Sequence, residues 1–253
     1  MTTTPTNGRT TGRGACRRSR QAGPPPRSTS RLTQRFIEGP PPSGPRRDPI
    51  EEPFADNELE RLTCRFRDMR RTVGPREGNR EWVRDPFAQW IRTLESARSF
   101  DAAATMLDRE GMAAFAVGMT ESLPIRDAAI VSLVIGRPCD ERMMIEIASQ
   151  PHSDRVRCGM SDMMTNAFHD ARARPDTERC RRGTAMLKRM GDAVPERWRV
   201  QPLAALAYVL WWMGDDLAVI RALECLALDE DCTLAGIVVS LIERGIRPAW
   251  CGS

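Results

Sequence analysis

Few side chains in this sequence are suited to proton transfer or metal binding. His152 and His169 are its two histidines, and Tyr208 is its one tyrosine. Cys158, His169 and Cys180 follow one another at intervals of eleven residues, and such residue types could bind a metal or pair a cysteine nucleophile with a histidine base. Because structural zinc sites place their ligands only a few residues apart, we expect no metal site here. We also expect no catalytic residues among these side chains.

The motifs of common enzyme and cofactor sites are also absent from the sequence. It has no glycine-rich dinucleotide loop, no phosphate loop with its lysine, no paired histidines of a zinc peptidase and no nucleophile elbow. Its eight cysteines include no CxxC pair, a pattern that favours buried, reduced thiols over a disulfide framework. We therefore expect no cofactor and a non-catalytic role, with an enzyme of unrecognised type as an alternative.

Two clusters near the C-terminus are further candidates for binding. Asp229, Glu230 and Asp231 could hold a cation, but at a helix boundary we expect them to cap the following helix. Trp211 and Trp212 are adjacent, and neighbouring residues on a helix point about 100° apart. We therefore expect one tryptophan in the core and the other partly exposed, where it would contact a protein partner.

Residues 1–48 have the composition of a tail and not of a folded segment. They are rich in Thr, Ser, Gly, Pro and Arg, and the first acidic residue is Glu38. Because such a segment buries too little apolar surface to offset its ordering entropy, we expect it to be disordered. It is either an unselected, solvated tail or a site that binds nucleic-acid phosphates. The residues expected to contact phosphates are Arg9, Arg13, Arg17, Arg18 and Arg20.

Residues 49–253 repeat their apolar side chains at helical intervals and are expected to form a single all-α domain. Alternation with a period of two, which would indicate strands, does not persist. Gly74 and Pro75 are expected to end the first helix, and residues 76–84 to form a polar connection before a new helix at Asp85. The clearest apolar stripe consists of Leu59, Leu62, Phe66, Met69 and Val73.

Residues 200–248 predict three consecutive helices joined by short turns. The first is expected to end at Gly214, Asp215 or Asp216 to cap the second, and Gly245 to end the third. Turns this short place neighbouring helices antiparallel, with their apolar faces packed together. The core residues expected for this unit are Leu206, Leu210, Ile220, Leu223, Leu234 and Leu241.

Several short segments of this region form a recognisable pattern. They are Pro202–Ala207, Trp211–Asp215, Leu226–Asp229, Leu234-Ala235 and Gly245–Pro248. The pattern resembles the C-terminal part of an actinobacterial family, the domain of unknown function 4192. That family also carries an Arg-Asp pair at the start of an upstream helix, for which Arg126-Asp127 is the counterpart here. The resemblance implies a helical hairpin similar to a tetratricopeptide unit and assigns no catalytic residues.

The fold expected from these observations is a set of antiparallel helical hairpins, arranged as a short solenoid or a bundle. No apolar run is long enough for a signal peptide or a membrane span, so we expect a cytoplasmic protein without a membrane partner. Its expected function is that of a helical protein-interaction module. A nucleic-acid-associated protein that binds through its arginine-rich tail is the alternative.

Overall fold

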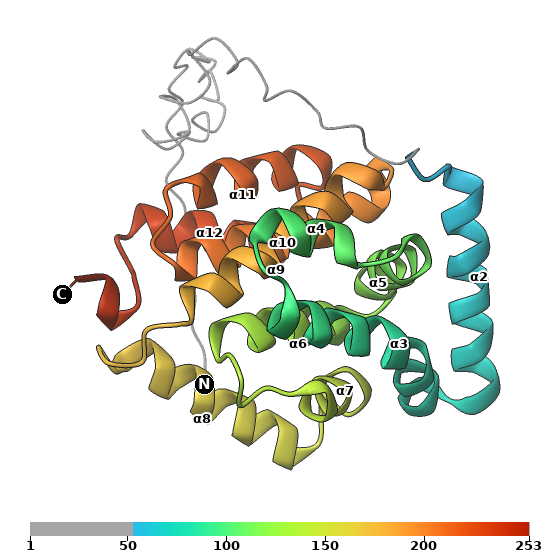
Figure 1. Cartoon of the computed structure of the whole chain (residues 1–253), viewed down its shortest axis with the longest axis horizontal. Coiled ribbons are helices and arrows are strands. Elements are labelled where there is room, and N and C mark those ends of the chain that lie inside the picture. The colour runs from blue at the N-terminus through green and yellow to red at the C-terminus, as the bar shows by residue number, and fades with distance from the viewer. Residues whose placement is uncertain (1–52, 253) are drawn as a thin grey trace, which may run out of the picture. The chain divides into compact units, whose positions relative to one another are not determined.

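The computed structural model describes residues 53–252, and every regular element in that range is helical (Figure 1). The prediction of an all-α fold is therefore confirmed. The predicted tail, residues 1–48, lies outside the described residues. The helices are α2 (Asp56–Val73), α3 (Pro75–Ser96), α4 (Phe100–Met106), α5 (Arg109–Glu121), α6 (Leu123–Val134), α7 (Glu141–Ser149), α8 (Asp154–His169), α9 (Thr177–Ala193), α10 (Glu196–Trp212), α11 (Leu217–Leu228), α12 (Thr233–Glu243) and the short 3-10 helix η1 (Ala249–Gly252).

Helix α3 replaces the polar connection that we expected at residues 76–84. Gly74, with a φ of 86°, makes the turn after α2, and the chain then remains helical past Pro86. A β-carbon at Gly78 would lie 2.9 Å from the Arg70 Cα, so the glycine allows α2 and α3 to pack closely. The expectation was wrong because Gly78 and Asn79 of this stretch are buried, which sequence hydropathy does not reveal.

Helix α10 is the centre of the packing, since it contacts α5, α6, α9, α11 and α12 (Figure 1). Trp198, at its N-terminal end, is fully buried and donates a hydrogen bond from Nε1 to Thr63 Oγ1 on α2 (3.3 Å). Trp90 on α3 makes the equivalent contact with Ser132 Oγ on α6 (3.0 Å). Both buried indole N–H groups are thus satisfied, and they tie distant helices of the sequence to one core.

The three C-terminal helices form where the sequence predicted them. Gly214 has a φ of 73° at the end of α10, and the Asp215 carboxylate accepts a hydrogen bond from the Leu217 backbone N–H (2.9 Å) at the start of α11. The expectation that the acidic cluster Asp229–Asp231 caps α12 was wrong. Cys232 is the N-cap residue there, while Asp229 Oδ1 accepts the Asp231 backbone N–H (3.1 Å) within the preceding turn.

The predicted core of this unit is correct for α10 and displaced for the next two helices. Leu206 and Leu210 are buried, whereas Ile220, Leu223, Leu234 and Leu241 are only partly buried. Small residues take the inner positions because they let α11 and α12 approach α10 closely. These inner residues are Ala218, Val219, Ala222 and Cys225 on α11, and Ala235 and Val238 on α12.

None of the helices between residues 53 and 252 is both long and apolar enough to cross a membrane.

Candidate functional site

The structure does not assemble the evenly spaced cysteines and histidine into a site. Cys158 and His169 are exposed on α8, and Cys180 is buried in α9, where its Sγ donates to the Leu133 carbonyl oxygen (3.4 Å). Burial raises the pKa of the Cys180 thiol to about 12, so this thiol is a core group and not a nucleophile. Among residues 53–252, no three His, Cys, Asp or Glu side chains are placed to hold a metal ion.

The expectation of an exposed tryptophan at position 211 or 212 was wrong. Trp211 is 5% exposed and Trp212 is 1% exposed. The Trp211 indole Nε1 donates to the Ile246 carbonyl oxygen (3.0 Å), and both rings pack against Phe168 of α8 and Tyr208 of α10. Both tryptophans are covered because α8, which is distant in sequence, packs Phe168 against them. The angle between adjacent side chains on a helix could not predict this tertiary contact.

The five tail arginines expected to contact phosphates lie outside the described residues. These are Arg9, Arg13, Arg17, Arg18 and Arg20.

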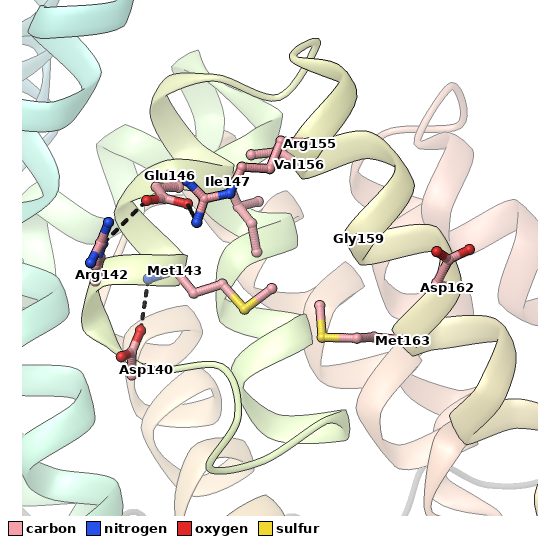
Figure 2. A pocket seen from close by; sticks show the side chains of 10 residues that line it. All are labelled: Asp140, Arg142, Met143, Glu146, Ile147, Arg155, Val156, Gly159, Asp162 and Met163. Atoms are coloured by element: carbon pink, nitrogen blue, oxygen red, sulfur yellow. Dashed lines mark hydrogen bonds and ion pairs between the residues drawn. The ribbon is translucent and has the colours of Figure 1, made fainter.

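A groove with a volume of about 570 Å³ lies between α7 and α8 (Figure 2). Its apolar lining comes from Met143 and Ile147 on α7 and from Val156 and Met163 on α8. Figure 2 shows the Met143 and Met163 side chains pointing toward one another across the opening. We call these four residues and the space between them the methionine groove. Its volume lies in the range of ligand sites, and its lining can change shape because methionine side chains are unbranched and flexible.

Charged side chains at one edge of the methionine groove pair with one another. The Glu146 carboxylate accepts a hydrogen bond from Arg142 Nε one turn away (3.3 Å), and Arg155 Nη2 of α8 lies 3.3 Å from its other oxygen (Figure 2). Both arginine side chains are largely exposed, while the glutamate is mostly buried. The Arg155 contact therefore links the two walls of the groove, and exposed pairs of this kind contribute little to stability.

Helix α8 is held to the rest of the molecule by a small apolar contact. Of its 16 residues, Val156 is the one that is buried. Met160, Met164 and Phe168 pack against the core while remaining partly exposed. Since few buried apolar contacts give a segment a low free energy of local opening, α8 is suited to move when the groove is filled.

A second groove, of about 350 Å³, lies among α9, α10 and α11. Two leucines of α10 form its floor, a leucine of α11 lies at its edge, and cationic side chains of α9 and α11 surround it. We call it the cationic groove. Its lining residues are Arg181, Thr184, Ala185, Lys188, Leu206, Leu210, Leu217 and Arg221.

Comparisons of the chain with protein-family models, with curated proteins and with solved structures find no match.

Our sequence-based reasoning missed the methionine groove, although the sequence contains a signal for it. Met143-Met144 and Met163-Met164 are methionine doublets in neighbouring segments. Met144 is buried in the core and Met164 packs against it, while Met143 and Met163 line the groove. The doublets alone do not place α7 beside α8, because that arrangement depends on the turn at residues 150–153.

Proposed function

We propose that this protein is a helical protein-interaction module, and that the methionine groove binds the apolar face of a partner's helix. The observation that carries the proposal is a methionine-lined groove between two helices, one of which has a single buried residue. A groove of this kind matches the way in which amphipathic helices insert apolar residues at intervals of three and four into a hydrophobic cleft. Flexible methionines let such a surface adapt to the side chains it receives.

The dimensions of α8 are consistent with a helical ligand. Its 16 residues extend over about 24 Å at the rise of an α-helix, which is long enough to lie along about four turns of a partner helix. Binding is favoured over catalysis because the least exposed carboxylate that lines the groove is already paired with two arginines. This carboxylate belongs to Glu146, which forms ion pairs with Arg142 and Arg155.

We also infer that the protein works in the cytoplasm. The seven cysteines among the described residues are all free, as expected in a compartment that keeps thiols reduced.

We retain the resemblance to the domain of unknown function 4192 as a further proposal. The buried Arg126 of the Arg-Asp pair donates from Nη2 to the Asp127 carboxylate (2.7 Å) and from Nη1 to Gln201 Oε1 of α10 (2.8 Å). This contact ties the upstream motif to the helix in which the resemblance is strongest, and so gives both parts a shared structural role.

Capture of partners by the full chain tests the interaction proposal. The wild type is compared with the double variant Met143→Glu/Met163→Glu, which places two charges in the methionine groove. It is also compared with Ile237→Glu, a matched apolar-to-acidic change at a side chain that is 45% exposed on α12. Thermal melting establishes that all three proteins are folded.

We expect a protein partner that the wild type and Ile237→Glu both retain and that the double variant loses. For a purified partner, the double variant should bind at least about tenfold more weakly, a loss of about 1.4 kcal/mol. A partner retained equally by the double variant would remove the methionine groove from the proposal. Turnover of a small substrate, without any partner, would favour the enzyme alternative.

A further inference from the structure

The cationic groove combines an apolar floor with a positively charged rim. Leu206 and Leu210 of α10 are buried at its base, and Leu217 at the start of α11 is 49% exposed at its edge. An exposed leucine at the edge of an apolar groove is available to a ligand without any rearrangement of the core. The groove shares no lining residue with the methionine groove.

The charged residues that line the cationic groove are all positive. Of its eight lining residues, three are basic and none is acidic. Each cation pairs with a carboxylate of its own helix outside the groove. The Arg181 and Lys188 side chains are about half exposed, and the Arg221 side chain is 28% exposed. Exposed pairs within a helix contribute only about 0.3–0.5 kcal/mol, so a ligand carboxylate can replace or share them. The pairs are Arg181–Glu178 (2.9 Å), Lys188–Asp192 (2.7 Å) and Arg221–Glu224 (2.7 Å).

The spacing of the cations defines the shape of a matching ligand. Arg181 and Lys188 lie seven residues apart on α9, which corresponds to two turns and about 10.5 Å along the helix axis. A helix lying alongside α9 presents side chains with the same spacing at its own positions i and i+7. Positions i+3 and i+4 of that helix, which lie between its positions i and i+7, would face the leucines of the groove.

We propose that the cationic groove binds an amphipathic helix of a partner protein that carries acidic residues seven positions apart and apolar residues between them. The acidic residues pair with Arg181 and Lys188, and the apolar residues contact Leu210 and Leu217. Because the charged residues that line the groove are positive, the partner's helix must carry negative charges that match them. The apolar floor distinguishes this ligand from nucleic acid, which would need a wider set of cations along a phosphate backbone.

Binding of a designed peptide to the full chain tests this proposal. The probe is a fluorescent helical peptide with glutamates at i and i+7 and leucines at i+3 and i+4. A second peptide carries lysines in place of these glutamates. The groove variant is Arg181→Glu/Lys188→Glu. The control is Arg157→Glu/Arg172→Glu, which makes the same change of net charge at exposed positions outside the groove. Fluorescence anisotropy gives the affinity, and thermal melting reports folding.

We expect the glutamate peptide to bind the groove variant at least about tenfold more weakly than the wild type, and the control within about twofold. The lysine peptide should show the reverse order, binding the groove variant better than the wild type, which a misfolded variant could not do. Equal loss in the groove and control variants would mean that binding follows net charge alone, and would overturn the proposal. Displacement of the peptide by duplex DNA but not by an unlabelled copy would overturn it in favour of a nucleic-acid site.

Discussion

Gly183 on α9 packs against Leu133 of α6. A β-carbon at this position would lie 2.3 Å from Leu133 Cδ2, whereas a β-carbon at Gly236 in α12 would meet no atom within 4 Å. We expect Gly183→Ala to lower the free energy of unfolding by about 1–3 kcal/mol, since the added methyl group overpacks the interface. Gly236→Ala, the matched control, should raise it by about 0.5–1 kcal/mol. Urea denaturation measures both, and equal effects would show that this helix contact is looser than described.

Cys232 has an environment that stabilises its thiolate. A hydrogen bond with Cys225 lowers its pKa most, and the Ala235 backbone N–H and the charge of Arg126 act in the same direction, so that the pKa of Cys232 falls below the usual range of a thiol despite burial. The same hydrogen bond and burial raise the pKa of Cys225, which therefore keeps its proton. The position of Cys232 at the start of α12 agrees with this, because helix N-termini favour anions.

This lowered pKa predicts a pH dependence of stability. A thiol whose pKa is lower in the folded state than its unfolded value of about 9 contributes stability that is present above pH 9 and lost as the pH falls through the folded-state pKa. Between about pH 8 and pH 5, the wild type should therefore lose more thermal stability than Cys232→Ser, in which no group titrates at this position. Thermal melts at the two pH values measure the difference. Parallel losses in both proteins would show that Cys232 remains a neutral thiol.

At the scale of helices, α10 and α11 differ in how they use leucine. Leu210 is buried against the core, while Leu223 is only partly buried because Ala222 and Cys225 take the inner positions of α11. We expect Leu210→Ala to cost about 2–5 kcal/mol of unfolding free energy, the usual range for a buried leucine. Leu223→Ala should cost less than half as much. Chemical denaturation measures both changes, and a larger loss at Leu223 would mean that α11 is rotated about its axis.

Sequence patterns predicted those helices whose ends carry glycine or proline and whose apolar side chains are large. They gave the turn at Gly214 and the leucines of α10 correctly. They did not reveal the first two turns of α3, where Gly78 and Asn79 are buried. Asn79 Nδ2 donates to Ser122 Oγ (2.9 Å) and to the Ala148 carbonyl oxygen (2.8 Å). Those partners lie 43 and 69 residues away in sequence, a separation that local periodicity does not encode.

The grooves could be predicted even less well than the helices. Lys188 is the only lysine of the chain, yet nothing in its local sequence indicates that it lines the same groove as Arg221 of α11. A groove depends on which side chains are left uncovered after packing, and this follows from tertiary contacts. One of Trp211 and Trp212 was expected to be partly exposed for binding, but both are covered, because Phe168 of α8 packs on their rings.

At the scale of the whole molecule, charge divides unevenly along the chain. Residues 1–48 hold ten arginines against Glu38 and Asp48, a net charge of +8. Since the full chain carries +4, residues 49–253 carry −4. Residues 49–253 are therefore acidic overall, although no carboxylate lines the cationic groove. An acidic surface repels phosphates over a Debye length of about 8 Å at physiological salt.

This division predicts where any binding to nucleic acid must arise. We expect the full chain to bind duplex DNA weakly, with an affinity that falls steeply as salt increases, because several arginines would release counterions from the phosphates. Removal of residues 1–48 should abolish this binding, since the remaining chain has a net charge of −4. Anisotropy titrations at two salt concentrations measure both proteins, and circular dichroism shows whether the shortened chain keeps its helices. If the shortened chain binds DNA as tightly as the full chain, the phosphate contacts must lie on the helices, and Arg181→Glu/Lys188→Glu then tests whether the cationic groove makes them.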